Sequence, residues 1–418
     1  MASGAVNLLQ NALLNQSYGA YILHLQSEFG WSKTLVSGVA GAQQLVLGFT
    51  GPVVGIILDR LGPRFAMRVG LVLMAIGFVL LSMIHNAFQL YGVFMFLALG
   101  ANLTGYLSTT FTVVHWFERR RSSALSLASV GMAFGGTAVY VVVLSLEHFG
   151  WRNTALISAA ALLIIGLPLS QIFVHHPEDI GLEIDGGPAR PKPGEIADAD
   201  TPLSTRGRIN FTLGEAMRHP TFWWICFGHT SALFVVQAVN VHLISDLTHS
   251  LGYSEANASL VLAGVTVMFG IGTVTGGLVG DRGDRQIASI ACMAMHTVGM
   301  ILLAYASNVF MVIGFVVVHG YAWGWRGPQM AALRADYFGR EHFGKIIGVS
   351  NVVIIIGQIT GPLIAGYSYD HTGSYVLGFD ILAGIAAFGS IFFWLAKRPD
   401  PPARYLAASA ELAATAEA

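Results

Sequence analysis

The sequence is poor in charge. Asp, Glu, Lys and Arg make up only 11% of its 418 residues, whereas 54% are hydrophobic. A soluble globular domain carries about a quarter charged residues. A chain with so little charge cannot cover a surface that faces water, so the composition predicts a protein whose solvent is lipid. The formal net charge of −1 excludes nucleic acid as an electrostatic partner.

Cysteines and enzyme motifs are equally scarce. The two cysteines, Cys226 and Cys292, lie in separate apolar runs, which excludes a disulfide scaffold and a cysteine metal site. The sequence has no Walker loop, no H-E-x-x-H string, no nucleophile elbow and no dense carboxylate cluster. We therefore expect no enzyme activity, no catalytic residue, no cofactor and no bound metal.

Hydrophobic runs are what the sequence has in abundance. A run of about 20 apolar residues spans the hydrocarbon layer of a membrane, about 30 Å thick, as a helix. Twelve such runs are present, near residues 1–25, 34–58, 66–85, 88–114, 123–146, 152–174, 220–246, 255–280, 286–306, 308–335, 344–369 and 374–396. They predict an all-α polytopic membrane protein with twelve transmembrane helices.

The basic residues predict how the chain is oriented. With both termini in the cytoplasm, only Lys33 and Arg152 fall in outer loops, and Arg326 alone falls inside a span. All other Lys and Arg residues fall in cytoplasmic loops or in the tail, as the positive-inside rule requires. We therefore predict a multi-pass protein of the cell inner membrane with both termini cytoplasmic.

One long polar segment divides the chain. Residues 175–218 are charged and rich in Pro and Gly, which predicts a flexible cytoplasmic linker. We accordingly expect an N-terminal six-helix bundle over residues 1–174, a C-terminal six-helix bundle over residues 219–398 and a cytoplasmic tail over residues 399–418.

The two halves repeat each other. Residues 29–60 align without gaps on residues 251–282, an offset of 222. The matching pairs include Gly30 with Gly252, Gly48 with Gly270, Gly55 with Gly277, Asp59 with Asp281, and Arg60 with Arg282. Internal repeats around a central cavity are typical of secondary transporters, which rock one half against the other.

The loop after the second span carries a motif. It reads Gly55-Ile-Ile-Leu-Asp59-Arg60-Leu-Gly62-Pro-Arg64, and the second copy, Gly277 to Arg285, has Asp284 where the second glycine belongs. This string resembles the loop 2–3 signature of the major facilitator superfamily. The resemblance covers nearly the whole chain and implies two pseudo-symmetric six-helix bundles.

The same motif predicts a conformational latch. Its glycines allow close helix contact and a tight turn, and an aspartate at a helix end suits the positive N-terminus of a neighbouring helix. Such a latch holds one conformation and breaks in the other; the alternative is an ordinary basic loop. The predicted latch residues are Gly55, Asp59, Arg60, Gly62, Arg64, Gly277, Asp281 and Arg282.

Three shorter strings resemble one branch of this superfamily, the monocarboxylate transporters and oxalate/formate antiporters, which move small carboxylates. They are Phe29-Gly-Trp-Ser32, His115-Trp-Phe-Glu-Arg-Arg120 before the small residues of span 5, and Val241-His-Leu243 followed by Asp246 and Gly252-Tyr-Ser254. Relatives in this branch often carry a basic residue in span 8 or span 11. The apolar interiors of those spans lack one here.

Arg326 is the one basic residue predicted at mid-membrane depth, about 15 Å from the cytoplasmic end of its span. An unpaired guanidinium there costs at least about 2.5–3.5 kcal/mol. Gly324, Gly327 and Pro328 thin and open the helix for a ligand. We predict that Arg326 binds the substrate carboxylate; the alternative is a permanent bond to helix carbonyls or to a carboxylate elsewhere. The pocket residues predicted beside it are Tyr321, Trp323 and His319.

Further polar residues lie on spans 1, 4 and 7, which face the cavity in this superfamily together with span 10. Each alone fits a hydrogen bond between helices as well as a ligand contact. Together they predict a polar cavity. The candidates are Asn11, Asn15, Tyr18, Asn102, Tyr106, Gln237 and Asn240.

Proton coupling needs a group that titrates near neutral pH. His242 and Asp246 are four residues apart on span 7, where they could share a proton or form an outer gate. His229, on the same span, is a third candidate. The alternative for His242 is a neutral hydrogen bond.

These predictions favour a secondary transporter for a small organic monocarboxylate such as lactate, pyruvate, formate or oxalate, driven by proton symport or anion exchange. Two alternatives remain: a carrier of neutral or drug-like solutes in which Arg326 is structural, and a membrane sensor that keeps the fold without transport. We expect a monomer whose partners are the carboxylate, membrane lipid and protons.

Overall fold

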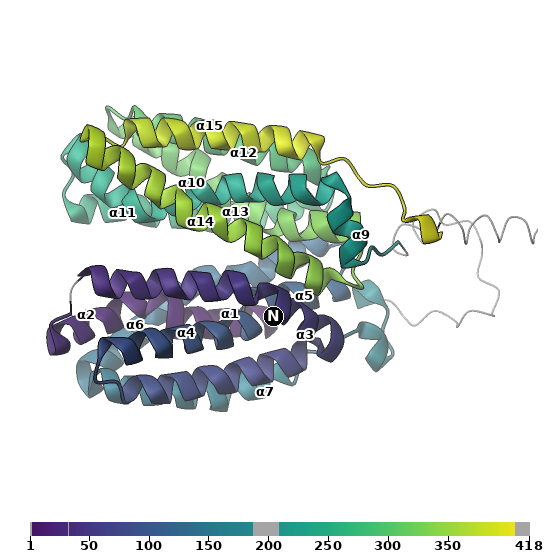
Figure 1. Cartoon of the computed structure of the whole chain (residues 1–418), viewed down its shortest axis with the longest axis horizontal. Coiled ribbons are helices and arrows are strands. Elements are labelled where there is room, and N and C mark those ends of the chain that lie inside the picture. The colour runs from purple at the N-terminus through teal and green to yellow at the C-terminus, as the bar shows by residue number, and fades with distance from the viewer. Residues whose placement is uncertain (1, 32, 187–208, 406–418) are drawn as a thin grey trace, which may run out of the picture.

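The computed structural model describes residues 2–31, 33–186 and 209–405, and most of them are helical (Figure 1). The first half contains α1 (Ala2–Gln10), the π-helical η1 (Asn11–Gln16), α2 (Tyr18–Phe29), α3 (Lys33–Ser82), α4 (Ala87–Thr104), α5 (Tyr106–Trp116), α6 (Arg121–Ala161), the π-helical η2 (Leu162–Gly166) and α7 (Leu167–Ser170). The second half contains α10 (Pro220–Leu251), α11 (Glu255–Gly280), α12 (Arg285–Ala304), α13 (Val309–Phe338), α14 (Phe343–Thr372) and α15 (Val376–Leu395).

Two of these helices are too long to be single spans. α3 has 50 residues and α6 has 41. At 1.5 Å per residue they reach about 75 Å and about 60 Å, whereas the hydrocarbon layer is about 30 Å thick. In each helix one glycine has a positive φ, 76° at Gly62 and 74° at Gly150. This backbone conformation interrupts a helix, so α3 supplies two spans and α6 supplies one span and the start of the next.

The helices match the predicted spans. Within the described residues, nine helical stretches are long and apolar enough to cross a membrane. Two of these stretches, Gly41–Ser82 and Tyr140–Ser170, continue across the interrupting glycines. With α3 and α6 divided there, and with residues 2–29 taken as the first span, the helices correspond one for one to the twelve predicted runs. The predicted all-α, multi-pass membrane fold is confirmed.

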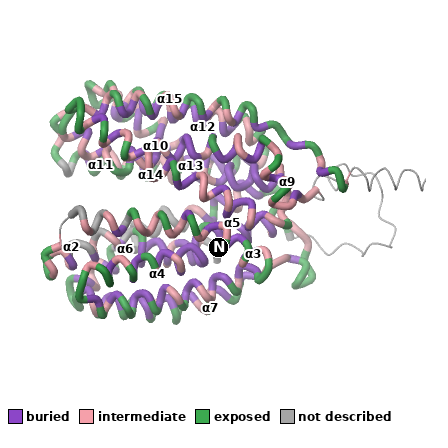
Figure 2. The backbone as a smooth tube through the Cα atoms, in the orientation of Figure 1, coloured by how far each residue is buried: buried purple, intermediate pink, exposed green. Residues whose placement is uncertain are grey.

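The outer faces of the helices are apolar. Large side chains there are exposed, among them Phe49, Ile164, Phe310 and Phe388. In Figure 2 the exposed residues follow the outer sides of the bundles, while the buried ones lie where helices meet. Lipid covers such a surface without the cost that water would impose.

The two halves lie side by side and meet at one end (Figure 1). Each half has its own buried apolar cluster. A third cluster crosses between the halves and joins Leu58 and Phe111 of the first half to Phe343 and Ile347 of the second. It lies at the end of the bundles where residues 175–186 and 209–218 are found, which we call the linker end. The opposite end shows the halves apart.

The repeat is visible in the ends of the helices. The side chain of Asn86 accepts a hydrogen bond from the first turn of α4, and Asn308, 222 residues later, does the same for α13. Gly30 and Gly252 end α2 and α10 with φ angles of 67° and 65°. The same local chemistry therefore begins and ends corresponding helices in both halves.

The predicted linker has ordered ends. Residues 187–208 lie outside the described residues, but the flanking parts contain the short helices η3 (Pro177–Ile180), η4 (Ile184–Gly186) and α9 (Leu213–Arg218). The first residues of the predicted tail pack against α9: Tyr405 accepts a hydrogen bond from the Asn210 N–H at 3.1 Å, and Arg404 pairs with Glu215 at 3.3 Å.

One prediction about charge is wrong. Arg334, predicted to lie in a cytoplasmic loop, is inside α13 with 2% of its surface exposed. The reason is that α13 continues to Phe338 and that Arg334 lies about two helical turns beyond Arg326. Both arginines are therefore buried within the second half.

Candidate functional site

A cavity of about 400 Å³ lies between the two halves. The first half lines it through α1, η1, α3, α4, α5 and α6, and the second half through α10, α11, α13 and α14. The polar lining residues are Asn7, Gln10, Asn11, Asn15, Gln44, Asn102, Tyr106, Ser129, His229, Thr273, Trp323, Asn351 and Gln358. Among the described residues, no Asp, Glu, Lys or Arg lines this cavity. Amide side chains therefore supply most of its polarity.

Several of the amides also hold helices together. Asn102 donates to the Leu47 carbonyl at 3.0 Å and to the Thr50 hydroxyl at 2.8 Å. Gln10 donates to the Ala101 carbonyl at 3.0 Å. For these residues the helix–helix role and the cavity position coexist, because an amide has an oxygen as well as its NH₂ group.

Aromatic rings form one side of the cavity. Trp323 packs against Phe269 with ring centroids 4.6 Å apart, and both line the cavity. Tyr106 comes from the other half and is 38% exposed. Two of the predicted aromatic residues, Trp323 and Tyr106, are therefore part of the lining.

His229 connects the cavity to a buried arginine. Arg334 donates a hydrogen bond to His229 Nδ1 at 3.3 Å, and it also donates to the Ser350 hydroxyl and the Met330 carbonyl. A guanidinium can only donate, so Nδ1 must accept and the ring carries its hydrogen on Nε2. His229 thus offers an N–H donor to the cavity, backed by a positive charge.

Arg326 does not line the cavity in this conformation, although the next two residues of α13, Gly327 and Pro328, do. Its side chain is 2% exposed, and its Nε and Nη1 atoms are buried without a hydrogen-bond partner among the described residues. No carboxylate in the described part of the chain pairs with it. Its electrostatic neighbours include Tyr106 and His229, which do line the cavity.

The two glycines near Arg326 have different surroundings. A methyl group on Gly324 would collide with the carbonyl oxygen of Phe269, so this glycine lets α13 approach α11. Gly327 has open space beside it and lines the cavity with Pro328. The Gly324 carbonyl, which loses its helical partner at Pro328, accepts a hydrogen bond from Thr273 at 3.3 Å.

The remaining predicted contact residues do not line the cavity. Tyr18 packs edge-on against Phe94, and Tyr321 is hydrogen-bonded to Thr275 at 2.9 Å between α11 and α13. His319 is fully buried beside His296. Gln237 and Asn240 lie on α10 nearer its far end, beyond the lining residues.

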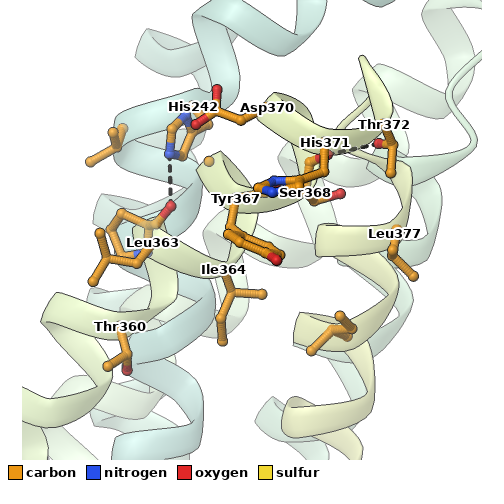
Figure 3. Close-up of a pocket in the computed structure, with 14 residues that line it drawn as sticks. His242, Thr360, Leu363, Ile364, Tyr367, Ser368, Asp370, His371, Thr372 and Leu377 are labelled. Atoms are coloured by element: carbon orange, nitrogen blue, oxygen red, sulfur yellow. Dashed lines mark hydrogen bonds between the residues drawn. The ribbon is translucent and has the colours of Figure 1, made fainter.

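The predicted pair His242 and Asp246 is not joined in the structure. His242 Nε2 donates to the Pro362 carbonyl on α14 at 2.9 Å (Figure 3). Asp246 is buried, and its Oδ2 atom has no hydrogen-bond partner among the described residues. The hollow of about 860 Å³ beside His242 is lined by exposed apolar residues such as Leu363 and Tyr367, so it opens toward lipid.

Both motif aspartates cap a helix of the opposite half. Asp59 accepts hydrogen bonds from the N–H groups of Gly344 and Lys345, at 2.9 and 3.1 Å, where α14 begins. Asp281 accepts from Ser122 and Ser123, at 2.7 and 3.2 Å, where α6 begins.

Glycine makes the first of these contacts possible. Side chains at Gly55 or Gly344 would collide with the facing backbone, and Gly277 faces Ser122 and Ser126 in the corresponding place. Arg64 donates to the Phe173 carbonyl at 2.7 Å within its own half, whereas Arg60 and Arg282 are exposed.

Ion pairs add to the contact between the halves at the linker end. Asp336 of the second half pairs with Arg121 of the first at 2.5 Å and with Arg285 of its own half. Arg340 reaches across to the His115 carbonyl at 3.1 Å and to Glu178 at 3.3 Å. Beside them, burial and the neighbouring His176 lower the pKa of His175.

Several lining residues were not predicted from the sequence. Gln44, Asn351 and Gln358 lie on α3 and α14, which are not among spans 1, 4, 7 and 10. An amide within an otherwise apolar span is the signal that could have indicated them. Within the described residues, no group of three or more His, Cys, Asp or Glu side chains could hold a metal ion.

Comparisons with known proteins agree with this architecture. The profile of the Major Facilitator Superfamily matches residues 4–243 and 225–417. Monocarboxylate transporter 13 of Bos taurus is 25% identical over 387 residues, which cover 90% of this chain and 83% of the relative. Monocarboxylate transporter 11 of Homo sapiens is 26% identical over 422 residues, with coverage of 94% and 81%.

Solved structures share the fold. The transporter FucP in its outward conformation superimposes with a TM-score of 0.73 at 17% identity, covering 95% of this chain and 98% of FucP. The human organic anion transporter MFSD10 gives a TM-score of 0.69 at 14% identity, with coverage of 94% and 97%. Relatives and fold are those of transporters and not of enzymes. The chain belongs to the major facilitator superfamily of membrane transport proteins.

Proposed function

We propose that this transporter carries a small organic monocarboxylate across the cell inner membrane by alternating access. The relatives that are named as monocarboxylate transporters support this substrate class. The observation that carries the proposal is the pair of buried arginines, Arg326 and Arg334, next to a cavity whose described lining has no acid.

The two arginines make the cavity electropositive. Within the described residues neither Arg326 nor Arg334 pairs with a carboxylate. A guanidinium at membrane depth costs at least about 2.5–3.5 kcal/mol, and a substrate anion in the cavity offsets part of this cost for both. A neutral solute offers no such compensation, so the charge distribution favours an anion.

We propose that His229 and Tyr106 make the first contacts with the carboxylate. The Nε2–H group of His229 and the hydroxyl group of Tyr106 are donors on opposite halves of the cavity. Arg334 polarises His229 through the bond to Nδ1, and Arg326 lies within electrostatic range of both. Arg326 then acts through its field in this conformation.

We propose that the described conformation faces outward. The positive-inside rule places the linker end in the cytoplasm, and the helix caps made by Asp59 and Asp281 close that end. In this proposal the motif residues act as latches that open when the halves rock. Proton symport and anion exchange both fit this cycle.

The proposal is tested with purified protein in proteoliposomes. We expect uptake of at least one of labelled lactate, pyruvate, formate and oxalate, with competition by the unlabelled acid. Arg326→Gln and Arg334→Gln should each raise KM by about tenfold or more, because the attraction between a buried cation and an anion several ångströms away is about 1–4 kcal/mol. Arg218→Gln, which changes an exposed arginine of α9, is the control.

The same experiment separates the alternatives. Uptake of a neutral or drug-like solute, with KM unchanged in both arginine variants, would replace the proposal by a neutral-solute carrier. Binding of the acid, seen as a change in tryptophan fluorescence, without any flux would indicate a sensor. A melting temperature measured for each variant excludes a simple loss of folding.

A further inference from the structure

A pair of histidines lies buried behind Arg326. His296 on α12 and His319 on α13 are both 0% exposed, and their Nδ1 atoms are 3.2 Å apart. The Nε2 atom of each ring is buried without a hydrogen-bond partner among the described residues. A buried polar atom without a partner costs about 1–3 kcal/mol, so the fold keeps two such atoms at a considerable cost.

The other half shows that the fold does not need these histidines. At the repeat offset of 222 residues, His296 corresponds to Met74 and His319 to Leu97, both buried. The offset holds in space as well: Gly77 packs against Leu97, and Gly299 packs against His319. The first half thus fills the same layer with apolar side chains. Only the second half has histidines at these two positions.

The geometry of the pair is that of a proton relay. One ring must donate its Nδ1–H to the Nδ1 lone pair of the other. The donating ring is left with a free Nε2 lone pair, and the accepting ring with a free Nε2–H. A proton that binds the free lone pair lets the shared proton move across, and the far Nε2–H can then leave. One proton enters and one leaves, so the pair returns to a neutral state with its tautomers exchanged.

The charges around the pair couple it to the cavity. Arg326 is the charged group within electrostatic range of both rings, and Cys292 and Tyr106 are the titratable groups near Arg326. Beyond it lie His229 and Arg334.

Of the helices packed on α12 and α13, α11 and α15 form the largest contacts, and α10 carries Asp246 near its far end. The only charged residues of α11 and α15 are Glu255 and Asp380 near their first turns, and Asp380 is hydrogen-bonded to Tyr305 at 2.8 Å. Within the described residues, no carboxylate therefore contacts the pair.

We propose that the pair formed by His296 and His319 is the site where the coupling proton binds when this carrier moves a monocarboxylate. This inference rests on the proposed function. When the cavity is empty, the charge of Arg326 opposes a proton on the pair. A carboxylate bound in the cavity offsets that charge, and the proton then binds more readily. By linkage the bound proton in turn strengthens binding of the anion. The proton and the anion then cross the membrane together with no net charge.

The test replaces each histidine by the residue that the first half has in its place. His296→Met and His319→Leu, alone and together, preserve an apolar packing that this fold already accommodates. Wild type should accumulate the labelled acid of the panel above when the outside is acidic. The double variant should lose about tenfold or more of this gradient-driven accumulation and keep its exchange of labelled for unlabelled acid, because exchange needs no net proton movement.

A second readout follows the proton itself. In weakly buffered detergent solution with a pH indicator, adding the acid anion to wild type should cause uptake of about one proton per chain. The double variant should take up none. His249→Leu, which removes an exposed histidine of α10, is the matched control and should behave as wild type. His242→Leu tests the other histidine candidate for coupling.

Each outcome decides one of the two proposals. If wild type carries none of the acids, the proposed function fails. If wild type carries an acid without taking up a proton, or if the double variant keeps gradient-driven accumulation within twofold, the proton site is overturned and the carrier stands. Two further outcomes also overturn the proton site. One is loss of proton coupling in His242→Leu alone, and the other is loss of exchange in the double variant with an unchanged melting temperature.

Discussion

At the scale of single residues, the role of a side chain depends on which of its atoms can contact a ligand in the cavity. His229 is the clearest case. Its Nδ1 atom is occupied by Arg334 at 3.3 Å, so only Nε2 is left for a ligand. A proton added to Nδ1 would break this bond and face the guanidinium. We therefore assign His229 a donor role and look for the coupling proton elsewhere.

A pair of substitutions separates the two nitrogens of His229. His229→Gln keeps a donor close to the position of Nε2, whereas His229→Asn keeps an acceptor close to Nδ1 and loses the cavity donor. We expect the asparagine variant to raise KM for the transported acid by about tenfold, since a hydrogen bond to a charged group is worth about 1.5–3 kcal/mol. The glutamine variant should change KM much less. Initial rates of uptake measure both, and equal values would contradict the tautomer argument.

At the scale of elements, the two copies of the motif form the same turn with different residues. Gly62 has φ 76° and ψ 168°, a region that only glycine adopts at low cost. Asp284 stands at the corresponding position with φ −73° and ψ 116°, and its carboxylate caps α12 through Gln286 and Ile287 at 2.7 and 3.2 Å. The missing glycine of the second copy is therefore replaced by an N-cap.

Exchanging the two residues should have unequal effects on stability. Gly62→Asp places a side chain in a strained conformation, at a cost of about 1–3 kcal/mol, and against His175, which a Cβ would approach to 3.0 Å. Asp284→Gly removes only the N-cap of α12. Replacing a capping side chain by glycine lowers stability by about 0.3 kcal/mol. We expect a clearly lower melting temperature in detergent for Gly62→Asp. A larger loss for Asp284→Gly would show that the cap, and not the turn, dominates.

At the scale of the whole molecule, two related contacts close the linker end. Asp59 reaches from the first half to α14 of the second, and Asp281 reaches from the second half to α6 of the first. A carboxylate at a helix N-terminus contributes about 0.3–2 kcal/mol. Both contacts join the halves only while this end is shut, so together they bias the equilibrium between the two conformations.

Removing both charges should shift that equilibrium. In Asp59→Asn with Asp281→Asn, we expect the opposite end to be open for less of the time. The reporter is Asn15→Cys, an exposed cavity position, because both native cysteines are buried. Its labelling from outside by a membrane-impermeant maleimide should slow by about fivefold or more. Asp370→Asn, at the far end of α14, is the control. An unchanged rate would mean that the apolar cluster and the Arg121–Asp336 pair suffice for closure.

Much of the fold could be predicted because its signals are local. The twelve apolar runs, the basic loops and the repeat at Gly30 and Gly252 each depend on short stretches of chain. The residues that line the cavity were predicted only in part. Asn11, Asn15, Asn102, Tyr106, His229 and Trp323 line the cavity, whereas Tyr18, Tyr321, His319, Gln237, Asn240 and Arg326 do not in this conformation.

The sequence by itself determined that this protein is a helical membrane protein with two repeated halves, because hydrophobic length and helix ends depend on consecutive residues. Only the tertiary structure decided which face of each helix meets the cavity. That choice depends on how far each helix is rotated against its neighbours, as the close approach of Gly324 in α13 to Phe269 in α11 illustrates. The same packing brought Arg334 to His229 and His296 to His319, residues 105 and 23 positions apart that no local pattern connects.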